Sequence, residues 1–134
     1  MIQRIQSILL FISAITTACF LFVFPYQTTV EDVHVLAMDN TVLLILGILS
    51  LLISMVTIFL FKDRKKQILM SSVNMGLILA TCAWIIYSMY QVQDTVKDYG
   101  LGIYFIAISY ILVSFAKKQI QKDQDLIDSV DRIR

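Results

Sequence analysis

Few side chains in this 134-residue chain could carry chemistry, and most of them lie outside its apolar stretches. His34 is the only histidine, with Glu31 and Asp32 close by in the sequence. Zinc and copper sites normally need several nitrogen or sulfur ligands, so one histidine with carboxylates is a poor ligand set. A catalytic triad also needs a histidine beside its nucleophile. We therefore expect no catalytic residue, cofactor or metal site, and we expect that the protein is not an enzyme.

The two cysteines, Cys19 and Cys82, lie within apolar runs. Neither has a second cysteine or a histidine at metal-ligand spacing, and free cysteines usually pack as small apolar residues. We expect packing roles for both. Most of the polar side chains lie between or beside the apolar runs, so the placement of these runs decides where the polar side chains lie.

Four apolar runs dominate a chain that is 58% hydrophobic with a mean hydropathy of +0.78. A helix needs about 20 apolar residues to cross roughly 30 Å of hydrocarbon. None of the runs contains Lys, Arg, Asp, Glu or His, so none shows the polar face of a soluble helix. The predicted spans are residues 7–25, 41–61, 68–90 and 99–116. We expect the first to be retained, because no small-x-small cleavage site followed by polar sequence is present.

The predicted fold is a single all-α membrane domain, an antiparallel bundle of four transmembrane helices, because short connections join the spans. Ten of the eleven Lys and Arg residues precede span one or lie in the inner loop 62–67 and the tail 117–134, and the eleventh is Lys97. Basic residues favour the cytoplasmic side. We expect both termini in the cytoplasm and loops 26–40 and 91–98 outside. In the longer outer loop, TVEDVHVLA alternates in part and predicts a short strand or an interfacial segment.

Small and weakly polar residues indicate how the spans associate, because helices in lipid attract each other through close packing and hydrogen bonds. Span two has one stripe of such residues, and span three has a small-xxx-small face. The only amide within the spans, Asn74, should bond to another helix or a carbonyl, with a ligand contact as the alternative. The candidate helix-packing residues are Gly47, Ser50, Ser54, Ser72, Asn74, Gly76 and Ala80.

From Lys117 onward the sequence becomes amphipathic. Helical spacing predicts an apolar edge made either of Ile120, Ile127, Val130 and Ile133 or of Leu126 with Val130 and Ile133. The predicted opposite face carries four acids, which are Asp123, Asp125, Asp128 and Asp131. The pattern favours span four continuing as an amphipathic cytoplasmic helix, and the alternative is a solvated, frayed tail.

Three stretches resemble a known family: the start MIQRIQS, the middle KDRKKQI with Asn74 seven residues after Gln67, and the ending AKKQI-KD--L-DSVDRIR. They are similar to a family of small bacterial four-span membrane proteins, known only as a domain of unknown function. The resemblance implies an integral inner-membrane protein and supplies no reaction. This chain departs from the family pattern at Asp128, where a basic residue is common.

The leading functional hypothesis is a non-enzymatic scaffold or interaction protein that works through its cytoplasmic face. The candidate partner-binding residues are Arg4, Lys62, Arg64, Leu126, Val130, Asp131, Arg132, Ile133 and Arg134. The expected partners are membrane lipids together with a second copy or another membrane or cytoplasmic protein, and no nucleic acid is expected, because the basic cluster flanks two spans and suits anionic headgroups.

The alternative hypothesis is a small transporter or channel component. Ser50, Ser54 and Asn74, with Trp84, would then line a cavity between spans two and three. Proton-coupled or ion-coupled transport normally uses an ionisable group within the membrane, and the predicted spans contain none.

Overall fold

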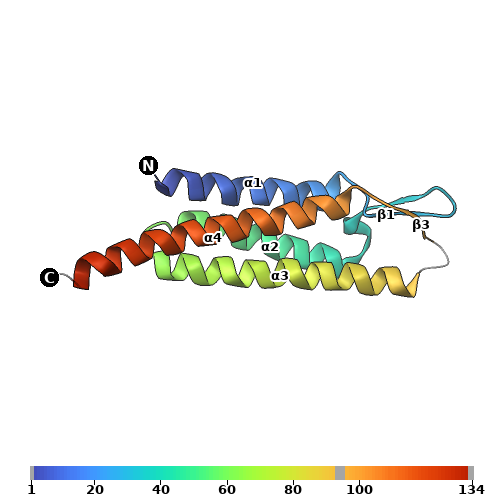
Figure 1. The fold of residues 1–134 in the computed structure, drawn as a ribbon. Coiled ribbons are helices and arrows are strands. Elements are labelled where there is room, and N and C mark those ends of the chain that lie inside the picture. The colour runs from blue at the N-terminus through green and yellow to red at the C-terminus, as the bar shows by residue number, and fades with distance from the viewer. Residues whose placement is uncertain (1, 93–95, 133–134) are drawn as a thin grey trace.

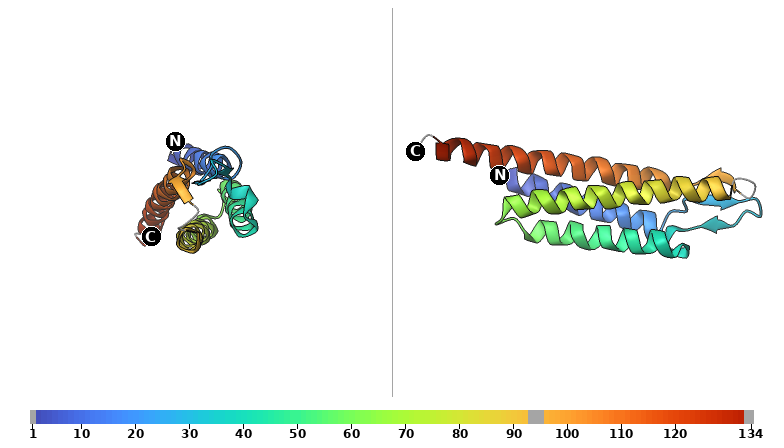
Figure 2. Two further views of the ribbon diagram at one scale, coloured as in Figure 1. Left: turned by 90° about the vertical axis from the view of Figure 1, so that its right-hand side faces the viewer. Right: turned by 90° about the horizontal axis from the view of Figure 1, so that it is seen from below.

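The computed structural model of the chain describes residues 2–92 and 96–132, with side chains described from Ile5 onward. Four long helices lie side by side in Figures 1 and 2: α1 (Ile2–Phe22), α2 (Thr41–Phe59), α3 (Arg64–Gln91) and α4 (Gly102–Arg132). All four are long and apolar enough to cross a membrane. The sequence-based prediction of four helices of membrane-spanning length and composition is therefore confirmed.

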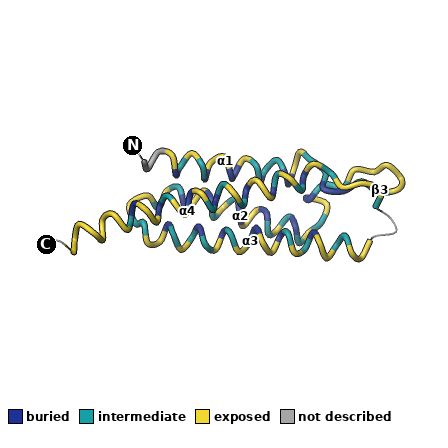
Figure 3. The backbone as a smooth tube through the Cα atoms, in the orientation of Figure 1, coloured by how far each residue is buried: buried dark blue, intermediate teal, exposed yellow. Residues whose placement is uncertain are grey.

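The four helices pack in a closed ring, which we call the helical body. α1 contacts α2 and α4, and α3 contacts the same two helices. Figure 3 shows the buried residues turned inward and the exposed residues turned outward along each helix. The outward faces carry large apolar side chains such as Phe11, Leu52 and Phe115. Outward apolar faces of this kind suit contact with lipid.

The two ends of the helical body differ in structure. The N-terminus, the turn between α2 and α3, and the C-terminal part of α4 lie at one end, which we call the basic end (Figure 1). The opposite end carries a small sheet, and we call it the sheet end. α4 extends beyond the other helices at the basic end (Figures 1 and 2).

A small antiparallel sheet accompanies the four helices in a chain that is mostly helical, as predicted. Its three strands, β1 (Gln27–Thr29), β2 (His34–Val35) and β3 (Val96–Tyr99), are antiparallel in the order β2-β1-β3. The strand expected in loop 26–40 is present, and a 3-10 helix, η1 (Ala37–Asp39), follows it. The segment 91–98 and the first residue of predicted span four were not expected to form a strand. β3 pairs with a strand far away in the sequence, so local alternation gives no sign of it.

Local signals explain where the helices begin and end. Asn40 caps α2, because its Oδ1 accepts hydrogen bonds from the backbone N–H groups of Val42 and Leu43 at 3.1 and 3.3 Å. α1 ends at Phe22, three residues before the single proline, Pro25. α4 begins at Gly102, shortly after β3 ends at Tyr99. Between them, Gly100 lies so close to the Pro25 carbonyl that a side chain at this position would collide with it.

Candidate functional site

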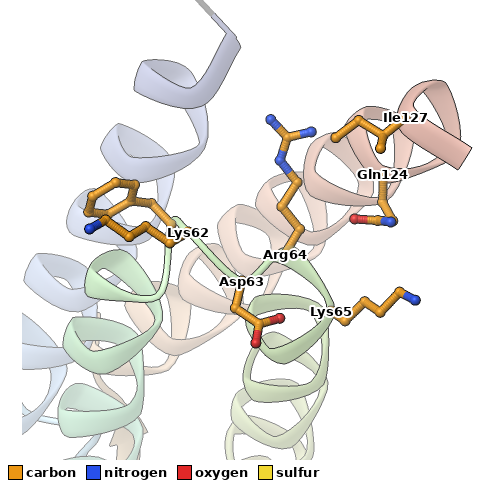
Figure 4. A pocket seen from close by; sticks show the side chains of 7 residues that line it. Lys62, Asp63, Arg64, Lys65, Gln124 and Ile127 are labelled. Carbon is orange, nitrogen blue, oxygen red and sulfur yellow. The ribbon is translucent and has the colours of Figure 1, made fainter. Parts of the chain in front are cut away.

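The basic end has a hollow between the α2–α3 turn and α4, with a volume of about 660 Å³. We call residues 61–66, which comprise most of this turn and the first three residues of α3, the basic turn. Figure 4 shows Lys62 and Lys65 pointing away from each other, while Arg64 reaches toward α4. The cations therefore spread outward and do not converge on one small ligand. The hollow is lined by Phe61, Lys62, Asp63, Arg64, Lys65, Gln124 and Ile127.

Asp63 organises the basic turn. Its side chain accepts from the backbone N–H of Lys66 at the start of α3, and its Oδ2 lies 3.0 Å from the Lys66 Nζ. These hydrogen bonds to Lys66 lower the pKa of the Asp63 carboxyl. The charge of Lys66 is thus balanced within the turn. Lys62 and Lys65 remain exposed as the outward-facing cations of the turn.

Asp123 joins three elements of the basic end. The residue is 7% exposed, and its carboxylate accepts a hydrogen bond of 2.6 Å from the side-chain amide of Gln6 in α1. Its backbone carbonyl accepts from the Arg64 Nη1 at 3.2 Å. A buried carboxylate needs such donors, and this one fixes α4 against α1 and the basic turn. Arg64, a candidate for partner binding, therefore also has a structural role.

The placement of Asp123 on the polar face of the tail was wrong. Asp123 follows the buried Ala116 and Ile120 at spacings of seven and three residues, which places it on the inward face of α4. This register is visible in the sequence, but Asp123 stands among other acids of the tail, Asp125, Asp128 and Asp131, which are all exposed.

Beyond Asp123 and Gln124, every residue of α4 from 125 to 132 is exposed, and we call this segment the overhang. The prediction that span four continues as an amphipathic helix is confirmed as far as Arg132. Leu126 and Val130 are each 62% exposed and Ile127 is 42% exposed. Asp131 and Arg132 are exposed beside them. The other candidates at this end, Ile133, Arg134 and the Arg4 side chain, lie outside the described residues.

The stripe predicted on span two packs as expected. Gly47, Ser50 and Ser54 are buried on α2. Ser50 Oγ donates to Asn74 Oδ1 at 2.6 Å, and Asn74 Nδ2 donates to Ser54 Oγ at 2.7 Å. The amide therefore has an interhelical partner for each of its two polar atoms, as the sequence predicted for a buried amide in a span.

The small-xxx-small face predicted on span three does not pack against another helix of the chain. Gly76 and Ala80 are exposed, and a Cβ added at Gly76 would meet nothing within 4 Å. Ser72 is partly exposed, and its Oγ donates to the Ile68 carbonyl of its own helix at 2.9 Å. This prediction was wrong, because α3 turns its Asn74 side inward.

A second buried polar cluster was not predicted. Ser109 Oγ on α4 lies 3.0 Å from Ser13 Oγ and 2.8 Å from Thr17 Oγ1 on α1. All three residues are buried. The spacing of Ser13 and Thr17 places them on one helix face, and Ser109 follows the buried Gly102 and Ile106 at spacings of seven and three residues. These spacings are the sequence signal that places the three hydroxyl residues on inward helix faces.

Four helices of membrane-spanning length and composition define the chain as a multi-pass membrane protein. The chain belongs to the family described as the domain of unknown function DUF4293, whose model matches residues 2–133. This match confirms the resemblance to a family of unknown function. A search of curated proteins gave no match, and a search of solved structures gave none either.

Proposed function

We propose that this protein is a non-enzymatic docking protein of the bacterial inner membrane. In this proposal its four helices form an antiparallel bundle that spans the membrane, and both termini with the basic end lie in the cytoplasm. The distribution of charge supports the orientation. Ten of the eleven Lys and Arg residues belong to the N-terminal segment, the basic turn and residues 117–134, whereas Lys97 lies in β3 at the sheet end, where it pairs with Asp32.

The exposed apolar edge of the overhang carries the docking proposal. Three lysines, Lys117, Lys118 and Lys122, precede the overhang and mark the membrane boundary. Exposed apolar residues on the spans are covered by lipid, but those of the overhang would face water. Burying a Leu or Val side chain contributes about 1.5–3 kcal/mol, so a partner that covers Leu126 and Val130 gains binding energy from both.

The overhang does not suit the membrane surface as its binding site. Asp125, Asp128 and Asp131 are all exposed along it. Anionic headgroups attract basic residues and repel these acids. A protein surface is therefore the better match for the apolar edge.

The test removes the apolar edge and keeps the fold. Leu126→Ser/Val130→Ser should remove the crosslinks to a partner in cells, because these side chains supply the exposed apolar surface. The matched control is Val30→Ser/Val33→Ser at the sheet end, where the two valines are 60% and 54% exposed. Crosslinked proteins are identified by mass spectrometry. An unchanged set of crosslinked proteins in the overhang variant would refute the docking proposal.

A separate experiment tests the orientation. A fluorescent protein fused after Arg134 should be fluorescent, because many such reporters mature only in the cytoplasm. A fusion placed between Glu31 and Asp32, in the turn between β1 and β2, should express without fluorescence. The reverse pattern would refute the proposed orientation.

The transporter hypothesis needs Ser50, Ser54, Asn74 and Trp84 to line a cavity. Packing is better supported, because the first three are buried and bond to one another. The Trp84 Nε1 donates to Asn40 Oδ1 at 3.3 Å, so its polar atom also has a partner. Reaction of the Ser54→Cys variant with a water-soluble thiol reagent distinguishes a transport cavity from interhelical packing. We expect protection, and rapid labelling would favour a water-filled pathway.

A further inference from the structure

We infer that the overhang binds a second copy of this chain, with the acidic overhang of each copy against the basic turn of the other. This inference rests on the proposed function, because it requires the basic ends of both copies to lie on the same side of the membrane. It goes further by naming the partner and the surface that receives the overhang.

The two surfaces carry opposite charges. The overhang presents the exposed carboxylates of Asp125, Asp128 and Asp131. The basic turn presents Lys62 and Lys65, while Lys66 is paired with Asp63 and Arg64 is bound to the Asp123 carbonyl. Opposite charges that face each other across an interface favour encounter and set its register.

These charges do not neutralise one another within one copy. Among residues 2–92 and 96–132, the ion pairs are Lys66–Asp63 and Lys97–Asp32, and neither involves the overhang. Asp128 instead accepts a hydrogen bond of 2.9 Å from Gln124 of its own helix. In Figure 4 the Lys62 side chain points away from α4. The opposite charges of the overhang and the basic turn thus remain available for an external partner.

Membrane geometry brings the two surfaces to the same depth. Two copies in one membrane with one orientation are related by an axis along the membrane normal, so equivalent residues lie at equal depth. Gln124 and Ile127 line the same hollow as Lys62 and Lys65, and they therefore lie level with the basic turn. Asp125 and Asp128 are neighbours of these two residues in the chain. The carboxylates of the second copy consequently lie level with the lysines of the first.

Apolar side chains accompany both charged surfaces. Phe61 is 50% exposed at the edge of the hollow, and Ile127 lines its opposite wall. Ile127 of a second copy can cover this apolar surface while its acids face the lysines, because Ile127 and Asp131 are four residues apart and share one helix face. An apolar centre with charged residues around it is the usual composition of a protein interface.

The first test is intermolecular disulfide formation between full-length chains in vesicles, with Cys19 and Cys82 replaced by alanine. A mixture of Lys62→Cys and Asp128→Cys chains should form a mixed disulfide dimer when an oxidant is added to take up the two electrons. The rate should exceed that of either variant alone at least about tenfold, because only the mixed pair is brought together across the interface. Equal rates in the three samples would refute the inference.

The second test is charge reversal with rescue, measured by energy transfer between labelled chains in the same vesicles. Lys62→Glu/Lys65→Glu should weaken self-association about tenfold, because like charges then face each other, and Asp125→Lys/Asp128→Lys should do the same. Mixing the two variants should restore association, since both contacts of the mixed dimer then join opposite charges. A lack of weakening, or a lack of rescue in the mixture, would refute the inference.

The outcomes distinguish this inference from the proposed function. If chains do not self-associate but the overhang still crosslinks a different protein in cells, the second-copy inference fails and the docking function stands. If the Leu126→Ser/Val130→Ser variant keeps every crosslink and the chains do not self-associate, both fail. Self-association that depends on the overhang and on both charge clusters supports both.

Discussion

α2 and α3 each carry a stripe of small residues, and only the α2 stripe is buried. Gly47, Ser50 and Ser54 face the interior, whereas Gly76 and Ala80 on α3 face outward. Asn74 accounts for the difference. It lies two residues from Gly76, which is about 200° around a helix, so both cannot face the same neighbour. The amide must bond inside the helical body, and the small residues turn outward as a result.

In this pair of helices, one strongly polar residue outweighs several small ones in setting which face of a span turns inward. Small residues permit close packing but do not require it. An amide left without a partner in hydrocarbon costs several kcal/mol, so it does require a partner. The following substitutions test this difference between the two stripes.

The largest effect is expected from a bulky residue on the α2 stripe. A Cβ at Gly47 would lie 2.5 Å from Leu21 Cδ2, and Leu21 is itself fully buried. Gly47→Leu should therefore destabilise the protein by about 3 kcal/mol through overpacking. The measurement is unfolding by a denaturing detergent, followed by the fluorescence of Trp84. The control is Gly76→Leu, for which we expect little loss, and equal losses for the two variants would contradict the comparison.

Removal of the amide should have the next largest effect. Asn74→Leu loses both interhelical hydrogen bonds to α2, and each such bond in a membrane protein contributes roughly 0.6–1.7 kcal/mol. We expect a loss of about 2 kcal/mol in the same unfolding experiment. Ser72→Ala is the matched control, since the Ser72 hydroxyl bonds only to a carbonyl of its own helix in the structure. If the two variants proved equally stable, Asn74 would not be the residue that orients α3.

The smallest effect is expected on the outward stripe. Gly76→Ala places a methyl group where nothing lies within 4 Å, and alanine is favoured over glycine in a helix by up to about 1 kcal/mol. We expect no loss of stability, or a gain of about 0.5 kcal/mol. Gly47→Ala should instead lose stability, because its methyl group meets Leu21. A clear loss in Gly76→Ala would show that the outward stripe is packed after all.

Sequence reasoning succeeded where one local signal was strong. The absence of ionisable residues identified four helices of membrane-spanning length. The amide of Asn74 identified an interhelical contact, and the spacing of Leu126 and Val130 indicated the overhang helix. It failed where two signals competed or where the partner was distant. The small-residue spacing of α3 competed with Asn74, and β3 gave no local sign of pairing with β1.

The Asp123 site shows the same limit. A charged residue in a segment rich in charge looks solvated, and only its register with Ile120 marks it as buried. Its donor, Gln6, lies near the opposite end of the chain, so no local window contains both residues. The sequence therefore predicted the residues of the overhang, but not the hydrogen bonds of Asp123 that fix α4 just before the overhang begins.

The sheet also sets the order in which its strands can pair while the chain is being synthesised. β1 is the central strand, and its two neighbours come from different parts of the chain: β2 follows it directly, whereas β3 is synthesised only after α2 and α3. During synthesis, one side of β1 therefore stays without its strand until α3 is complete. The pairing of Gln27 with Tyr99 then joins the connection after α1 to the connection before α4. The sheet thus closes late in biogenesis, and a chain halted before β3 would leave this end of the molecule unjoined.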